Sequence, residues 1–201
     1  MNLKFTLAYD GSLFQGSQKQ PNGMTVEDKL LKAFKKINIE TNIVLSGRTD
    51  KEVHATGQVF NCVVPDFWQD FFKLKDILNK NLPSSIKILR IQKVKDDFHS
   101  RFHAKKRVYR YLITTKPTTP FNNKFITHIK NVDEELLQKA IKEFIGVYDF
   151  KYFHKTGSDK ELTKREIFDA KFYKYKDIYV FNFTANSYLR SQIRLMVGFL
   201  L

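Results

Sequence analysis

The stretch that most constrains this chain runs from Ser46 to Val59 and has the sequence Ser-Gly-Arg-Thr-Asp-Lys-Glu-Val-His-Ala-Thr-Gly-Gln-Val. It lies between two β-rich runs, 42–46 and 58–64, and a glycine marks each boundary. A loop tied to a strand at both ends is a rigid place to hold a reactive side chain. Asp50 follows Arg48 by two residues, and an aspartate near a cation stays ionised at neutral pH and can act as a nucleophile. An aspartate here is also typical of an ordinary turn, so composition alone leaves both interpretations open.

The longer pattern around Asp50 resembles a known family. Gly-Arg-Thr-Asp at 47–50 is followed by Val-His-Ala at 53–55 and Gly-Gln-Val at 57–59. This combination is similar to the signature of the tRNA pseudouridine synthase A family. In that family the aspartate of the first motif is catalytic, so the resemblance implies that Asp50 is the catalytic residue.

Two further segments carry the same resemblance. Residues 107–111 match the family's arginine-x-tyrosine-x-tyrosine pattern, which implies that Tyr109 stacks on the extruded uracil and is a candidate to remove its C5 proton. Residues 188–194 resemble the last strong motif, which implies that Arg194 pairs with Asp50. The alternative for Arg194 is the solvated side of an ordinary amphipathic helix, whose apolar stripe begins at Leu189 and on which Arg190 lies on the same side as Arg194. For Arg48, two residues before Asp50, we expect that the side chain fills the gap that the base leaves.

The chain departs from the family pattern at three places. Ser17 stands where the family usually has tryptophan, and Lys51-Glu52 stands where it has alanine-glycine. If that glycine has a positive φ, Glu52 is strained by about 1–3 kcal/mol. The sequence also stops inside an apolar helical pattern, whereas the family continues, so we expect a C-terminally truncated chain.

Composition limits the kind of partner. The 201 residues carry a net charge of +14, which favours a polyanion, either nucleic acid or an anionic membrane surface. No apolar run approaches the ~20 residues of a membrane span, and the N-terminus lacks the apolar core of a signal peptide. Nucleic acid in the cytoplasm is therefore the expectation. The single cysteine, Cys62, excludes an intramolecular disulfide and is expected to pack as a small hydrophobic residue.

Periodicity and turn signals predict the architecture. Alternation predicts a strand over 2–9, and a capping-box pattern at Thr25 begins a helix. The proline-containing segment 114–124 is the best internal boundary, giving an N-terminal half 1–116 and an incomplete C-terminal half 117–201. These elements predict an α+β fold with a mainly antiparallel sheet and helices on one side. The resemblance implies two ferredoxin-like halves whose sheets join, with the cleft between them.

Other candidate sites are weaker. Asp10 can be catalytic, but Asp-Gly is a routine turn and we favour the turn. His99 and His103 have the spacing of two metal ligands on a helix, but no third ligand accompanies them. We therefore expect no metal, and the lack of a phosphate-binding glycine loop predicts no nucleotide cofactor.

The resemblance implies that the protein converts uridine to pseudouridine at positions 38 to 40 of the tRNA anticodon stem-loop, as a homodimer. Asp50 either attacks the nucleoside or takes a ribose proton. Two other classes stay open on composition. One is a metal-dependent nuclease that uses Asp10, Asp50 and Glu52, and the other is a non-catalytic RNA-binding module.

Overall fold

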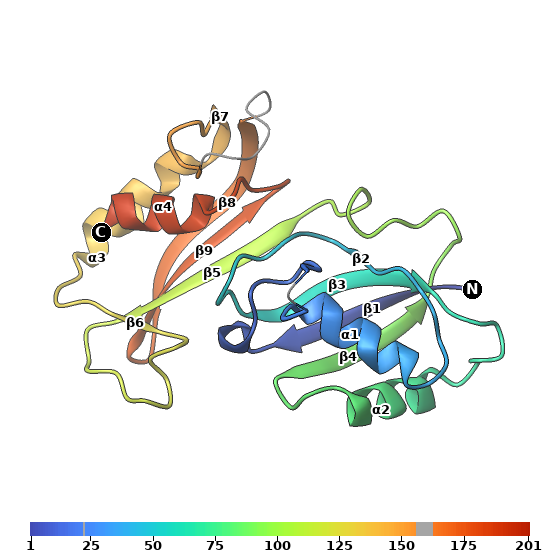
Figure 1. Cartoon of the computed structure of the whole chain (residues 1–201). Coiled ribbons are helices and arrows are strands. Elements are labelled where there is room, and N and C mark those ends of the chain that lie inside the picture. The colour runs from blue at the N-terminus through green and yellow to red at the C-terminus, as the bar shows by residue number, and fades with distance from the viewer. Residues whose placement is uncertain (22, 156–162) are drawn as a thin grey trace. The chain divides into compact units, whose positions relative to one another are not determined.

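Two structural units account for the residues that this computed structural model describes, which are 1–21, 23–155 and 163–201. The first unit spans Met1–Ala104 and the second Lys105–Leu201, and each has its own sheet (Figure 1). The division falls earlier than the predicted boundary at residue 116. The reason is strand pairing, because the strand at 107–114 hydrogen-bonds to a strand of the second unit.

The first unit is an antiparallel sheet with strand order β2-β3-β1-β4. Its strands are β1 (Asn2–Tyr9), β2 (Val44–Leu45), β3 (Ala55–Val63) and β4 (Ile86–Lys93). The predicted strand over 2–9 is confirmed and is central, with Phe5 opposite both Phe60 and Ile91. The strand β3 begins earlier than predicted, because β1 has an irregularity after Leu7 that lets Tyr9 pair with Ala55.

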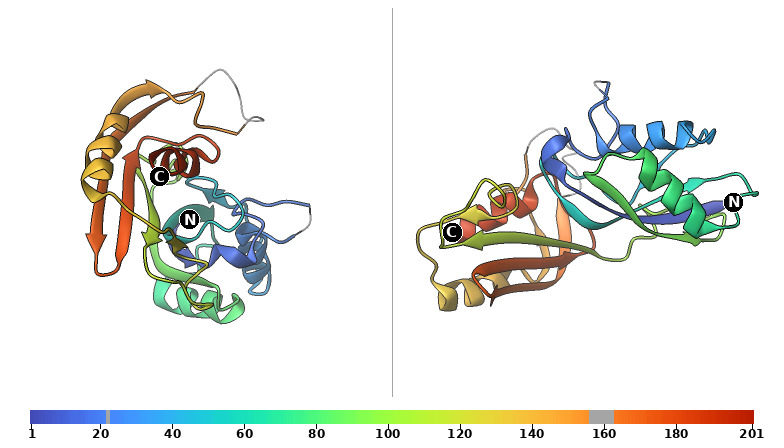
Figure 2. Two further views of the ribbon diagram at one scale, coloured as in Figure 1. Left: turned by 90° about the vertical axis from the view of Figure 1, so that its left-hand side faces the viewer. Right: turned by 90° about the horizontal axis from the view of Figure 1, so that it is seen from below.

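Two helices cover one face of this sheet, α1 (Val26–Lys35) and α2 (Phe71–Asn81) (Figures 1 and 2). The predicted capping box is present: the Thr25 hydroxyl accepts a hydrogen bond from the Asp28 amide, and Asp28 accepts one from the Thr25 amide. Phe34 of α1 meets Phe5 of β1 edge to face, with ring centres 5.7 Å apart. Cys62 is buried in this core as predicted, and burial raises the pKa of its thiol to about 12.

The second unit is a five-stranded sheet of order β6-β5-β9-β8-β7. It contains β5 (Arg107–Thr114), β6 (Thr127–His128), β7 (Gly146–Asp149), β8 (Lys164–Tyr175) and β9 (Ile178–Ala185). Among the strands that the structure describes, only the short β5–β6 pair is parallel, so the prediction of mainly antiparallel sheets is confirmed.

Helical elements from two separate parts of the second unit share one core. They are α3 (Glu134–Ala140), the 3₁₀ turn η2 (Ile141–Phe144) and α4 (Gln192–Leu200). The Phe144 ring lies 6.4 Å from Phe183 of β9 and 6.5 Å from Phe199 of α4. Alternate residues of β9, which are Tyr179, Phe181, Phe183 and Ala185, turn toward this core. The α+β class with helices packed on sheets is thus confirmed. The joining of the sheets and the cleft between the halves stay predictions.

Across the described part of the chain, no helix is both long enough and apolar enough to span a membrane.

Candidate active site

Asp50 lies in the connection between β2 and β3, as the sequence predicts, and its side chain is half-buried. The base of this loop, residues 46–54, is closed by the Ser46 amide, which donates to Val59 O at 2.8 Å. We call it the catalytic loop after the role that the sequence predicts for Asp50. The Gln58 side-chain amide donates to Gly47 O at 2.6 Å. The loop therefore starts and ends on the same strand pair, which limits how far Asp50 can move.

The residue before Asp50 is held from three directions. The Thr49 amide donates to Ser17 Oγ at 2.8 Å, and Thr49 O accepts from the Ser17 amide at 3.1 Å. The Thr49 hydroxyl lies 2.8 Å from the Tyr9 hydroxyl. Ser17 is fully buried, so the exchange of hydrogen bonds with Thr49 takes place away from water. Ser17, which the sequence shows only as a departure from the family's tryptophan, is thus a positioning residue for the catalytic loop.

The segment 10–17 packs against the catalytic loop backbone to backbone. Gly16 has φ +102°, and a Cβ built there would lie 2.9 Å from Thr49 O. A Cβ on Gly11 would lie 2.1 Å from Val53 O. Real side chains do not fit at either distance, so both glycines are required by the close approach of the two segments.

Asp10 caps the 3₁₀ turn η1 (Gly11–Leu13) by accepting from the Ser12 amide at 3.1 Å and the Ser12 hydroxyl at 2.6 Å. This confirms the turn interpretation of Asp10. His54 Nδ1 lies 3.0 Å from the Gly11 amide and 3.1 Å from Asp10 Oδ1. Nδ1 cannot both accept a hydrogen bond from the Gly11 amide and donate one to Asp10 Oδ1. We assign Nδ1 as the acceptor, because the amide hydrogen cannot rotate away and Ser12 already satisfies Asp10.

The residues after Asp50 form an exposed turn. The Val53 amide donates to Asp50 O at 3.2 Å, and Glu52 inside this turn has φ +67°. The position where the family has glycine thus has a positive φ in this chain, and Glu52 occupies a backbone conformation that favours glycine. The Lys51 ammonium lies 3.6 Å from the Glu52 carboxylate, and both side chains are more than half exposed. A pair this exposed adds little stability.

Arg48 lies on the exposed side of the same loop. Asp10, Asp50 and Glu52 do not form the carboxylate cluster that a two-metal nuclease would use. Among the residues that the structure describes, no three histidine, cysteine, aspartate or glutamate side chains are grouped to hold a metal ion. The segment with His99 and His103 is a series of turns rather than the helix that their spacing suggested.

Tyr109 lies on β5, opposite Phe183 of β9, and is half-buried. Its ring contacts Tyr188 edge to face, with centres 5.1 Å apart. Burial, and secondarily the nearby Tyr109, raise the pKa of the Tyr188 hydroxyl far above its usual range, and this hydroxyl donates to Arg107 O at 3.4 Å. Tyr188 therefore stays neutral and supports the Tyr109 ring.

Arg194 is exposed on α4, which begins later than the apolar pattern predicts. Ser191, with φ +60°, precedes the helix, and the Gln192 side chain accepts a hydrogen bond from the Leu189 amide at 2.8 Å. Arg190 consequently lies before the helix, and the prediction that it shares a helical face with Arg194 is wrong. Asp50 and Arg48 belong to the first unit and Tyr109 and Arg194 to the second, so the Arg194–Asp50 pair stays a prediction.

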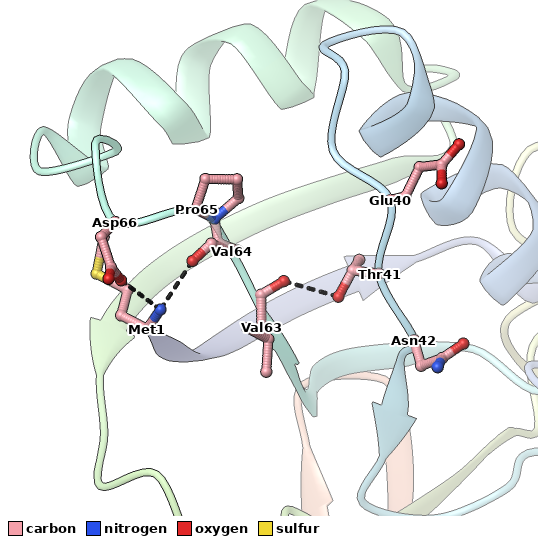
Figure 3. Close-up of a pocket in the computed structure, with 8 residues that line it drawn as sticks. All are labelled: Met1, Glu40, Thr41, Asn42, Val63, Val64, Pro65 and Asp66. Carbon is pink, nitrogen blue, oxygen red and sulfur yellow. Dashed lines mark hydrogen bonds and ion pairs between the residues drawn. The ribbon is translucent and has the colours of Figure 1, made fainter.

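A surface hollow elsewhere in the first unit contains none of these residues (Figure 3). The Met1 ammonium donates to Val64 O at 2.8 Å and to Asp66 at 2.6 Å, and this contact lowers the pKa of the Asp66 carboxyl. The Thr41 hydroxyl donates to Val63 O at 2.7 Å. Met1, Thr41 and Asp66 thus bind groups within the hollow. None of the predicted site residues lines it, so the hollow is not the predicted catalytic site.

Comparison with known proteins identifies the family. A family model described as tRNA pseudouridine synthase matches residues 6–103 and 140–201. The chain is 40% identical over 195 residues to tRNA pseudouridine synthase A of Wolinella succinogenes. The aligned region covers 97% of this chain and 77% of that relative. The enzyme of the same name from Campylobacter jejuni strain RM1221 is 38% identical, with 98% and 82% covered. That of Streptococcus agalactiae strain NEM316 is 38% identical, with 98% and 79% covered. The chain belongs to the tRNA pseudouridine synthase family.

Proposed function

We propose that this protein isomerises uridine to pseudouridine in tRNA, at positions 38 to 40 of the anticodon stem-loop. The observation that carries the proposal is the family's Gly-Arg-Thr-Asp motif, with Asp50 half-buried on a loop fixed at Thr49. A fixed carboxylate can react with a substrate without first paying the entropy of being ordered.

The reaction conserves atoms and needs no electron donor or acceptor. The bond from N1 to C1′ breaks, the base turns, and a bond from C5 to C1′ forms. C5 loses a proton and N1 gains one. Asp50 either attacks the nucleoside or takes a proton from the ribose, and both roles require the ionised carboxylate.

The other predicted residues assist with binding and proton transfer. A uridine inside a paired stem must leave the stack before protein groups can reach C1′ and C5, at a cost of a few kcal/mol. Arg48, exposed on the catalytic loop, fills the vacancy with its planar guanidinium. Tyr109 stacks on the extruded uracil and is a candidate acceptor for the C5 proton. Arg194 pairs with Asp50 and keeps it ionised.

The proposal includes the wider setting. The net charge of +14 favours binding to the tRNA backbone. The working form is a homodimer in the cytoplasm, with tRNA in contact with both subunits.

The test is to incubate the protein with unmodified tRNA that carries uridine at 38, 39 or 40, without added cofactor. Pseudouridine is then mapped along the anticodon arm. The same tRNA with cytidine at these positions is the control. The proposal predicts pseudouridine at the uridine positions alone, in the presence or absence of EDTA. Binding without conversion would favour the RNA-binding module, and EDTA-sensitive strand cleavage would favour the nuclease.

A further inference from the structure

The segment 98–103 of the first unit is anchored to the sheet by buried amide side chains. The side-chain amide of Asn61 donates from Nδ2 to Asn2 Oδ1 at 3.1 Å. Asn61 Oδ1 accepts from the backbone amide of Ser100 at 2.8 Å. The Asn2 side chain also donates to Phe98 O at 2.9 Å. Asn2, Asn61 and Ser100 are buried, so water competes little for these bonds. The segment is therefore held in one conformation on β1 and β3.

Two histidines complete a tight turn within the segment. The His103 amide donates to His99 O at 2.9 Å. The Phe102 amide donates to His99 Nδ1 at 3.3 Å, and the His99 amide donates to His103 Nδ1 at 3.2 Å. With both Nδ1 atoms accepting, each neutral ring has its proton on Nε2, where it can donate to another group.

The turn presents an aromatic side chain to solvent. Phe102 is 74% exposed, although its backbone is held in place. The His99 ring lies 4.2 Å from the Phe102 ring at an interplanar angle of 24°, and so supports one of its faces. The Arg101 guanidinium lies 5.9 Å from the Phe102 ring centre. A supported aromatic ring beside a cation, both on a fixed backbone, is the combination with which proteins stack a nucleic-acid base and bind the adjacent phosphate.

We propose that Phe102, with His99 and Arg101, forms an RNA-binding site in addition to the catalytic loop. An unpaired base of the tRNA stacks on Phe102, and the neighbouring phosphate is bound by Arg101. The inference rests on the proposed function for its choice of RNA as the ligand, and it extends that function by naming a contact outside the residues around the reacting uridine.

A second exposed phenylalanine provides a matched comparison. Phe72 on α2 is 79% exposed, and the Lys75 ammonium lies 5.3 Å from its ring centre. However, Asp76 follows Phe72 by four residues on the same helix face and is exposed. A carboxylate at this place repels a phosphate, so Phe72 has the exposure and the cation but not the electrostatic setting for RNA.

The experiment measures equilibrium binding of unmodified tRNA to the parent protein, Phe102→Ala, Phe102→Trp and Phe72→Ala. We expect Phe102→Ala to weaken binding about tenfold, as for the loss of one stacked base. Phe102→Trp should retain parental affinity, and Phe72→Ala should stay within about twofold. Because Phe102 is exposed, the unfolding temperatures of the Phe102 variants should match that of the parent protein. Arg101→Gln should lower the slope of log K against log salt by about one unit, as for one lost phosphate contact.

Parental binding by Phe102→Ala, or equal losses in Phe102→Ala and Phe72→Ala, would overturn the proposal. Pseudouridine formation, measured on the same samples, separates the two claims. If the parent protein converts uridine and Phe102→Ala leaves both Kd and KM unchanged, this site is wrong and the function stands. If binding depends on Phe102 but no pseudouridine forms, the site stands and the proposed function fails.

Discussion

The two sides of Asp50 are built in different ways. On the N-terminal side, Thr49 forms hydrogen bonds to Ser17 and Tyr9, and its carbonyl touches the glycine of a neighbouring segment. On the C-terminal side, Lys51 and Glu52 are exposed, and Glu52 has φ +67°. The comparison indicates that the hydrogen bonds of Thr49 position Asp50 from the N-terminal side, while the two residues directly after Asp50 face solvent and Glu52 adds backbone strain.

Among the variants that compare the two sides of Asp50, the largest effect is expected at Gly16, whose backbone lies close to Thr49 O. Gly16→Ala places a Cβ 2.9 Å from Thr49 O at a φ of +102°, which strains the backbone by about 1–3 kcal/mol and displaces the loop. We expect a lower free energy of unfolding and at least about a tenfold loss of turnover, equivalent to ~1.4 kcal/mol in the barrier. Gly57→Ala in β3 is the control, because no atom lies within 4 Å of a Cβ there. If both variants behave alike, the contact with Thr49 does not position Asp50.

An intermediate effect is expected at Ser17. Ser17→Ala removes the acceptor for the Thr49 amide in a fully buried place, which costs about 1–3 kcal/mol of stability. Turnover should fall while tRNA affinity is retained, since the change acts on the loop and not on an RNA contact. Ser12→Ala removes a hydroxyl from the same segment, but one bonded to Asp10, and should leave turnover near the parental value. Equal turnover in Ser17→Ala and the parent would contradict the account of the N-terminal side.

The smallest effect, and one of opposite sign, is expected at Glu52. Glu52→Gly relieves the positive φ and should raise the free energy of unfolding by about 1 kcal/mol, at unchanged turnover. Lys51→Gly, at a neighbouring position without a positive φ, should lower the free energy of unfolding, because glycine gives the unfolded chain greater conformational freedom. Chemical denaturation of both variants checks the prediction. Destabilisation by Glu52→Gly would mean that the Lys51–Glu52 side does support the loop.

The sequence predicts local features of this protein well, because they depend on neighbouring residues. The strand over 2–9, the Thr25 capping box and the placement of Asp50 between two strands follow from alternation and turn chemistry. Features that depend on distant partners are missed. Nothing near Ser17 in the chain shows that it binds Thr49, and nothing in the proline-containing segment shows that β5 pairs with β9. The start of α4 is missed for a related reason, since Leu189 is buried in the core without being helical.

The central claim is that Asp50 carries the chemistry on a loop fixed from the side of Thr49. The most direct test is the single-turnover rate of pseudouridine formation by Asp50→Asn, with tRNA affinity and unfolding measured on the same sample. The substitution keeps the shape of the side chain and removes its ionisable group. We expect no detectable conversion, with affinity and stability close to those of the parent. Asp10→Asn, at the carboxylate that caps the turn η1, should retain conversion, because asparagine is an equally good cap. Conversion by Asp50→Asn within about tenfold of the parent, or ~1.4 kcal/mol in the barrier, would contradict the claim.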